Sequence, residues 1–391
     1  MSRRSHLALQ LEAKQLRLAS VADRIRKRLH GSSYWRDIAA RHSLNGVTRK
    51  QLSKLLAREL HSSNQESAVV ALPEFEVRGT QCFYGGNALG AIDEDLAKNV
   101  HILQDGGTPP NLAALLKAGL AVQTRASASN VPERALIVSP HRDDSSLSIG
   151  GIMVARAKQE AHTVCNVFTT SSWLGQDFPP CELQAVSRLR KSEEFLSRQV
   201  LGATGVGLGL WEADIRTCHR CATENYSERE DAIFEGDPTL RSPGERDSIE
   251  YGFWYLMEQL CPSRVYFPLG LGSHIDHLFL SDFGKAKLTS IATRYPACRI
   301  YFYEDLPYAT YKHIDVNSFV SLEAMNGAAL APEYEDISEH FEAKIQAIAA
   351  HRSQFRRSEN EDRLRTYAEL LAAEAGFGGG QLAERVWRVQ P

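Results

Sequence analysis

A histidine and two aspartates directly follow an apolar run in the stretch "LIVSPHRDDSSLSIGG", residues 136–151. The run "LIVS" has the composition of a buried strand, and the residues after the cluster are typical of a helix. Asp and Ser side chains at such a junction commonly cap the first turn of the helix. Histidine and aspartate are also metal ligands and proton acceptors. His141, Asp143 and Asp144 therefore predict either a helix cap or a metal site.

A second polar cluster, "GSHIDH", supplies His274, Asp276 and His277 after another apolar run. Ligands of open α/β sheets bind beyond the carboxyl ends of the strands, where both clusters are expected to lie. Catalytic zinc usually has three protein ligands and one open position. His141 and Asp144 are close enough in sequence to face one ion, with either His277 or His274 as the third ligand. Together the clusters favour a zinc site, although iron(II) or another divalent ion suits the same ligands.

Short apolar runs alternate with amphipathic stretches from Val131 onward. Strands are predicted at 135–139, 162–171, 205–210, 263–270 and 298–304, and helices at 149–161, 183–202, 246–260 and 276–295. Such alternation is typical of βαβ units with right-handed crossovers. We therefore expect an α/β fold with a Rossmann-like, mainly parallel sheet and helices on both faces, preceded by a mostly helical N-terminal extension.

Charged residues are unevenly distributed along the chain. The formal net charge is −3, yet residues 1–60 contain 14 Lys or Arg against 4 Asp or Glu. This shift predicts a basic helical segment at 1–60, an accessory region and linker at 61–130, and the catalytic domain at 131–391. Basic helices could bind nucleic acid, but no base-reading motif is present. We favour packing of residues 1–60 on the domain, on a protein partner or on a second copy of the chain.

The composition is that of an ordinary globular protein, with 43% hydrophobic and 24% charged residues. No apolar run approaches the roughly 20 residues of a membrane-spanning helix, and we expect a cytoplasmic protein with no membrane partner. Seven scattered cysteines favour reduced thiols over a disulfide framework. The single C-x-x-C pair, Cys218 and Cys221, is weak evidence for metal or redox chemistry.

The two polar clusters resemble the motifs of the PIG-L/LmbE family of zinc-dependent de-N-acetylases. The family motifs are P/A-H-x-D-D after a strand and H-x-D-H after a later strand, and here they read "PHRDD" and "HIDH". Further stretches are similar to a bacterial branch found in specialised metabolism: "RKSEEFLSRQVLG", "LGLWEADIR", "FYEDLPYA", "AIAAHRSQF" and "GGQLAERVW". The resemblance covers residues 131–387.

This resemblance implies a role for each residue of the two motifs. The implied metal ligands are His141, Asp144 and His277. Asp143 would be the general base for a water activated by the metal. His274 would stabilise the oxyanion or protonate the leaving amine, and Asp276 would orient or tune a neighbouring histidine.

The resemblance also implies substrate contacts and shows two departures from the family pattern. Arg190 matches the arginine of the family's R-x-x-E helix and would shape the substrate pocket, and Glu212 or Asp214 would contact the substrate. Arg142 replaces the usual proline, and Ser145 replaces the usual glutamate. The second departure leaves the substrate class open.

These residues predict a hydrolase that requires a metal, Zn²⁺ or another divalent ion such as Fe²⁺. The reaction would remove an N-acetyl or other N-acyl group from a small molecule, an amino sugar or a biosynthetic intermediate. One alternative is an amidase acting on a peptidyl or carrier-linked amide. The other is a non-catalytic binding protein that uses the basic N-terminal helices.

Overall fold

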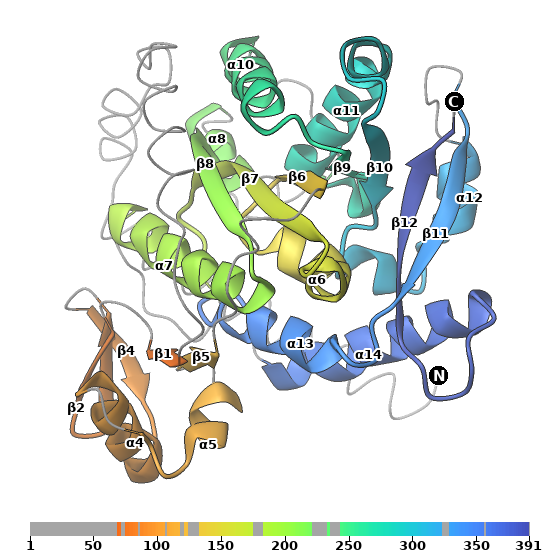
Figure 1. Ribbon diagram of the computed structural model, residues 1–391. Helices are drawn as coiled ribbons and strands as arrows, with labels where there is room; N and C mark the ends of the chain where they lie inside the picture. The colour runs from red at the N-terminus through yellow and green to blue at the C-terminus, as the bar shows by residue number, and fades with distance from the viewer. Residues whose placement is uncertain are drawn as a thin grey trace, which may run out of the picture.

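A seven-stranded sheet forms the centre of the computed structural model, with strand order β11-β12-β10-β9-β6-β7-β8 (Figure 1). The structure describes residues 69–71, 75–84, 87–105, 108–117, 121–123, 133–174, 183–220, 233–234, 243–322, 328–355 and 357–390. The sheet strands are β6 Glu133–Ser139, β7 Glu160–Thr170, β8 Thr204–Trp211, β9 Arg264–Pro268, β10 Arg299–Tyr303, β11 Leu330–Asp336 and β12 Ala383–Val389. Strands β6 to β10 match the predicted strands and pair in parallel, which confirms the mainly parallel sheet. The antiparallel pairs β10·β12 and β12·β11 extend one edge and were not predicted.

The strand order reverses at β6, which lies between β7 and β9. Ile137 of β6 is paired with Val164 of β7 on one side and with Tyr266 of β9 on the other. The chain runs outward through β7 and β8 and then returns to start β9 on the opposite side of β6. Such a reversal opens a crevice beyond the carboxyl ends of the two central strands.

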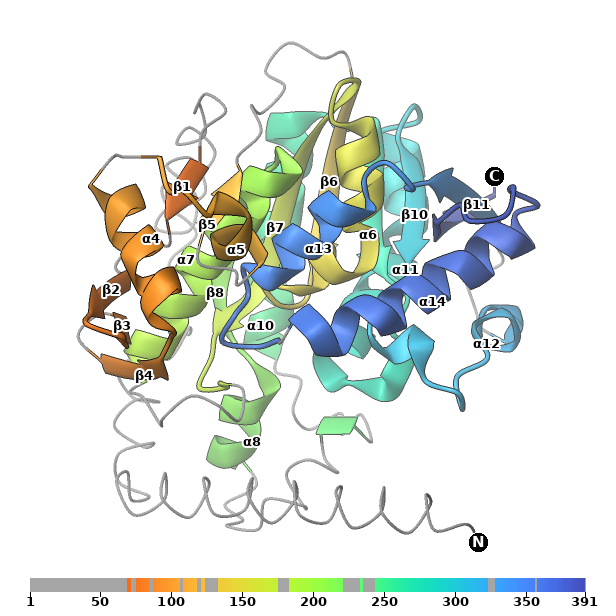
Figure 2. The ribbon, with the colours of Figure 1, turned by 90° about the horizontal axis from the view of Figure 1, so that it is seen from below.

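Helices cover both faces of this sheet (Figures 1 and 2). Successive side chains of a strand point to opposite faces, so β6 contributes to two cores. Leu136 and Val138 pack in a cluster with residues of α10 Pro243–Leu260 and α11 Ile275–Arg294. Ala135 and Ile137 pack in another cluster with residues of α6 Asp144–Arg156, α7 Leu183–Leu201 and α13 Phe341–Ala349. Both predicted layers of helices are present.

Further helices complete the described part of the chain after residue 133. They are α8 Ala213–Arg220, η3 Leu271–Ser273, η4 Tyr308–Thr310, α12 Val316–Leu322 and α14 Arg357–Glu374. No helix among the described residues is long and apolar enough to span a membrane.

The described residues 69–123 form two small antiparallel sheets and two helices. Their elements are β1 Val69–Ala71, β2 Phe75–Arg78, β3 Gln81–Tyr84, β4 Asn87–Ala91, α4 Glu94–Gln104, α5 Leu112–Lys117 and β5 Ala121–Gln123. Val100 and Leu115 belong to the same hydrophobic cluster as Leu189 and Val200 of α7. This part is therefore packed on the α7 side of the sheet. The predicted basic helices of residues 1–60 and Cys221 lie outside the described residues.

Candidate metal centre and active site

The two polar clusters meet at the reversal of the strand order. His141 lies in the turn after β6, and Asp144 is the first residue of α6. His274 and His277 follow β9, at the start of α11. Because β6 and β9 are adjacent parallel strands, their carboxyl ends deliver both clusters to one place.

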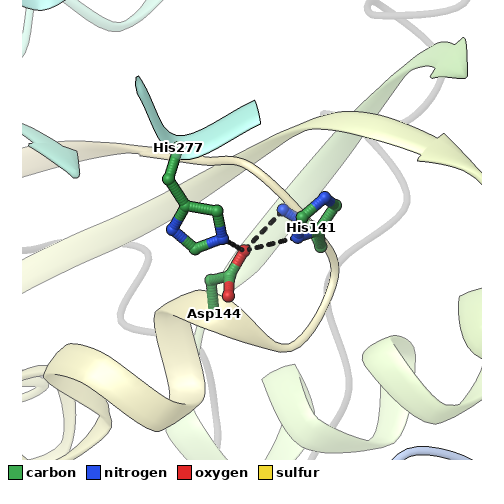
Figure 3. Close-up of side chains that lie close together, drawn as sticks. All are labelled: His141, Asp144 and His277. Carbon is green, nitrogen blue, oxygen red and sulfur yellow. Dashed lines mark hydrogen bonds and ion pairs between the residues drawn. The ribbon is translucent and has the colours of Figure 1, made fainter. Parts of the chain in front are cut away.

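The Asp144 carboxylate lies between two imidazoles (Figure 3). Its Oδ2 atom is 3.1 Å from His141 Nδ1 and 3.4 Å from His277 Nε2. The same oxygen accepts a hydrogen bond of 2.7 Å from the His141 backbone N–H, which fixes the carboxylate against the turn. Three potential ligand atoms thus converge from two loops.

These three atoms suit a divalent ion. Ligands bound at 2.0–2.1 Å around a tetrahedral zinc lie about 3.4 Å apart, close to the two separations measured here. His277 Nε2 is buried and has no hydrogen-bond partner among the described residues, which costs free energy unless a ligand occupies that position. The ligand atoms of His141, Asp144 and His277 all lie within 4.8 Å of one another.

A second group of possible ligands, His141, His274 and Asp276, is equally compact. In this group, however, His141 Nε2 already contacts Asp276 Oδ2 at 3.0 Å. Asp276 also forms a buried ion pair with Arg216, whose positive charge opposes a cation at that carboxylate. His277 is therefore a better third ligand than His274, a choice that the two motifs by themselves left open.

A carboxylate holds the second ring nitrogen of each proposed ligand histidine. Asp276 contacts His141 Nε2, and Asp305 contacts His277 Nδ1 at 2.6 Å. The other Asp305 oxygen accepts the backbone N–H groups of Gly270 and Leu271, at 2.7 and 2.9 Å. Such partners fix the orientation of a ligand histidine and raise its basicity. Asp305 was not predicted as a site residue, although it follows β10 in the stretch "FYEDLPYA".

The electrostatics of the centre favour positive charge. Burial is the largest single effect and would lower the pKa values of His141 and His277. The surrounding carboxylates together outweigh it and raise both pKa values, Asp144 most, with Asp276 acting on His141 and Asp305 on His277. Burial would raise the pKa of Asp144, whereas the two imidazoles hold it well below its usual range. Burial would also raise the pKa of Asp276, and Arg216 and His141 keep it low. The negative potential of these carboxylates, which favours the protonated form of the two histidines, would also favour a bound divalent cation.

Asp143 does not act as a helix cap. It occupies the N-cap position of α6, but its side chain makes no capping hydrogen bond. Instead its Oδ1 atom lies 3.4 Å from Arg190 Nη2. Arg190 Nη1 in turn donates to both Glu212 oxygens at 2.7 Å and to Ser171 Oγ at 2.6 Å. A buried arginine thus connects Asp143 to Glu212.

Arg190 and Glu212 are almost inaccessible, with exposed fractions of 3% and 6%. Burial raises the pKa of Glu212, and the Arg190 guanidinium opposes this effect. Arg190 contacts Asp143, and Glu212 contacts Arg190, so these contacts suit residues that hold Asp143 in position. Direct contact with substrate stays a prediction for Arg190 and for Glu212. Asp214 accepts a hydrogen bond from Ser172 Oγ, one residue from Ser171.

His274 lies beside the proposed ligands. Its ring centroid is 5.0 Å from that of His141 and 5.2 Å from that of His277. The Asp276 backbone N–H donates to His274 Nδ1 at 3.2 Å. Burial, followed by the neighbouring His141, lowers the pKa of His274 well below its usual value.

Arg142, which stands where the family usually has proline, points away from the ligands. Its Nη1 atom lies 3.4 Å from the buried Glu194 carboxylate of α7. Ser145 is buried at the first turn of α6. Neither departure from the family pattern displaces a ligand of the triad.

Comparison with known proteins finds a family match over the part of the chain that holds both clusters. Residues 136–288 match the family described as PIG-L: GlcNAc-PI de-N-acetylase. Both polar clusters lie inside the matched range, which confirms the resemblance of the sequence motifs.

Similar proteins include a curated relative and several solved structures. The 2'-N-acetylparomamine deacetylase of Streptomyces fradiae is 29% identical over 182 residues, 45% of this chain and 58% of the relative. This chain therefore spans less than two thirds of that protein. One similar solved structure is a deacetylase of the teicoplanin biosynthesis pathway in a complex with bog. It is 22% identical to this chain with a TM-score of 0.47, and the match covers 66% of this chain and 98% of the solved chain. Another is the A40926 pseudoaglycone deacetylase, which is 23% identical with a TM-score of 0.45. That match covers 66% of this chain and 97% of the solved chain.

Proposed function

We propose that this protein is a metal-dependent hydrolase that removes an N-acetyl group from a small molecule. The observation that carries the proposal is the buried His141, Asp144 and His277 triad, with Asp143 beside it. The match to the PIG-L family and the similarity to a deacetylase support the same reaction class. An N-acetylated amino sugar or related biosynthetic intermediate is the proposed substrate, and zinc is the proposed metal.

A divalent metal at the triad would polarise the amide carbonyl and lower the pKa of water to about 7. Asp143 would accept the proton of the attacking water, and Arg190 would hold its carboxylate in place. Because His274 Nδ1 accepts a hydrogen bond from Asp276, the neutral ring carries its proton on Nε2. His274 would therefore donate a hydrogen bond to the oxygen on which negative charge develops, the first of its two predicted roles.

The purified full chain tests this proposal directly. Metal content is measured, the metal is removed with a chelator, and Zn²⁺, Fe²⁺ or Co²⁺ is added back before assay on a panel of N-acetyl amino sugars and peptidyl amides. We expect deacetylation of amino sugars that is lost with the metal and restored by its return. Hydrolysis of the peptidyl amides alone would favour the amidase alternative.

Asp143→Asn separates catalysis from metal binding. We expect kcat to fall by about 10²–10⁴-fold with metal content unchanged, because the variant loses the proton acceptor while the three proposed ligands stay in place. Asp247→Asn, at an exposed position of α10, is the matched control and should retain full activity. A chain that binds no divalent metal, or an unchanged kcat for Asp143→Asn, would overturn the proposal.

The roles of the other parts of the chain remain predictions. A boundary at 60 and a linker ending at 130 are tested by comparing chains truncated at those positions. Binding of a protein partner or a second copy through residues 1–60 is tested by measuring the mass of the full chain in solution. Salt-dependent DNA binding by the full chain would support the non-catalytic alternative.

A further inference from the structure

Residues 140–143 form the turn between β6 and α6, which we call the ligand turn. The turn carries His141 and Asp143, and Asp144 follows it as the first residue of α6. Figure 3 shows His141 and Asp144 directed from this part of the chain toward one point, where His277 also arrives. A shift of the ligand turn would therefore move two proposed ligands and the proposed general base together.

Arg142, in the middle of the ligand turn, extends its side chain to α7. Its Nη1 atom lies 3.4 Å from Glu194 Oε2, and the two side chains are only 9% and 4% exposed. A Cβ atom on Gly207 of β8 would lie 3.6 Å from Arg142 Nη2, so the guanidinium also borders the sheet. A buried guanidinium needs a carboxylate to balance its charge, and Glu194 supplies it.

The Glu194 carboxylate is held by other partners as well. Asn166 of β7 donates to its Oε1 atom at 2.9 Å. Arg198, one helical turn further along α7, donates from Nη2 to its Oε2 atom at 3.3 Å and pairs with its Oε1 atom through Nε. Glu194 is therefore a fixed acceptor whose place does not depend on Arg142.

Two residues of α7 grip consecutive residues of the ligand turn. Arg190 and Glu194 are four positions apart, so they lie on the same face of the helix. Arg190 lies 3.4 Å from Asp143, and Glu194 lies 3.4 Å from Arg142. The two ion pairs have opposite polarity, so a slip of the turn by one residue would bring like charges together, away from water. The pairs thus favour one register of the turn on the helix.

We propose that Arg142 is a positioning residue: its ion pair with Glu194 anchors the ligand turn on α7 and so holds Asp143 and both ligands of the turn in place. The catalytic consequence rests on the proposed function, whereas the anchoring itself does not. Proline, which is usual at this position in the family that the motifs resemble, restricts the backbone through its ring. In this chain a long-range side-chain contact would supply the restraint instead.

Three variants of the full chain separate this role from general stability. Arg142→Met removes the charge from the turn, and Glu194 keeps Asn166 and Arg198, so we expect the variant to fold. Arg142→Lys keeps a charge for the single contact and should lie between Arg142→Met and the unaltered chain. Arg198→Met is the matched control, because it removes the other guanidinium from the same carboxylate and leaves the turn untouched. Thermal melts verify folding.

Hydrogen–deuterium exchange of the metal-free chains measures the anchoring directly. Peptides that cover residues 139–146 should exchange about tenfold faster in Arg142→Met, as expected for the loss of a hydrogen bond between charged groups. The same peptides should exchange at the unaltered rate in Arg198→Met. This readout needs neither metal nor substrate.

Metal affinity and turnover report the consequence for the site. Competition with a chelating dye should show about tenfold weaker Zn²⁺ binding for Arg142→Met, since both His141 and Asp144 depend on the turn. With N-acetyl amino sugars and saturating metal, kcat should fall about 10–100-fold while KM changes little, because the proposed base is displaced from the reacting water. Arg198→Met should leave both quantities unchanged.

Unchanged exchange of residues 139–146 in Arg142→Met would overturn the inference, as would an equal loosening in Arg198→Met. Arg142→Lys no better than Arg142→Met would show that packing, and not the ion pair, holds the turn. Faster exchange in Arg142→Met, with no hydrolysis of any N-acetyl amino sugar by the unaltered metal-loaded chain, would support the anchor and count against the proposed function.

Discussion

Both proposed ligand histidines are oriented by an aspartate from another part of the chain. Asp276 holds His141, and Asp305 holds His277 while also accepting two backbone N–H groups of the loop before it. A histidine ring that is held in this way meets the metal without losing side-chain freedom on binding. With the proposed ligand set, Asp276 and Asp305 would orient the ligand histidines without binding the ion themselves.

Asp305→Asn should weaken metal binding by about 10–100-fold. The asparagine oxygen can still accept the hydrogen bond of His277, but it lacks the negative charge of the carboxylate that raises the basicity of the ring. Competition with a chelating dye at fixed pH measures the affinity, and a thermal melt verifies that the variant folds. Asp247→Asn is again the surface control. An affinity for metal equal to that of the unaltered chain would show that Asp305 serves only the fold.

At the scale of elements, the helix that carries Asp144 is broken. Ile149 in α6 has φ −127° and ψ 20°, which interrupts the helix. Glu384 of β12 accepts the backbone N–H groups of Gly151 and Ile152, at 3.0 and 2.7 Å, and so caps the second half. Lys344 of α13 pairs with the same carboxylate at 2.6 Å. A strand and a helix from the C-terminal part of the chain thus stabilise the element beside the metal centre.

Glu384→Gln should destabilise the protein by about 3–5 kcal/mol, because it leaves the buried Lys344 ammonium without its counter-charge. The double variant Glu384→Gln with Lys344→Met removes both charges and should recover most of this loss. Urea unfolding of the two single variants and the double variant gives the coupling energy. A double variant no more stable than Glu384→Gln would contradict this account of the pair.

At the scale of the whole molecule, the fold buries the titratable side chain of Glu193 near Arg190 and Asp143. Glu193 of α7 is 1% exposed and accepts the Ser353 backbone N–H and Oγ hydrogen bonds, at 2.8 and 2.6 Å. Burial raises the pKa of Glu193 to about 8, although Ser353 opposes the shift. The folded protein therefore holds a proton that the unfolded chain releases near its ordinary pKa.

Stability should consequently fall as pH rises from the unfolded pKa of Glu193 to its folded value of about 8. In that window the folded state binds one more proton, so the free energy of unfolding drops by up to about 1.4 kcal/mol per pH unit. Glu193→Gln should remove this decline, and Glu339→Gln, at an exposed position, should keep it. Urea unfolding of the metal-free proteins at several pH values measures the difference. A difference between Glu193→Gln and the unaltered chain that is constant with pH would contradict the assignment.

Much of the fold was predictable because its signals are local. Apolar runs and helical periodicity located β6 to β10 and the helices between them, since each pattern reflects burial within a few residues. Strands β11 and β12 were not predicted. They lie at the edge of the sheet, and their antiparallel pairing joins segments about fifty residues apart, which no local pattern encodes.

The sequence by itself determined the chemistry of the site, because His141, Asp143, Asp144, His274 and His277 stand in two short motifs directly after apolar runs. The tertiary structure shows which of these residues lie close enough to share the roles proposed for them. Side-chain distances favour His277 over His274 as the third proposed ligand. Long-range contacts bring Asp305 to His277, Arg190 to Asp143, and Glu384 to the second half of α6. Pairing between distant strands sets such contacts, so only the folded chain reveals them.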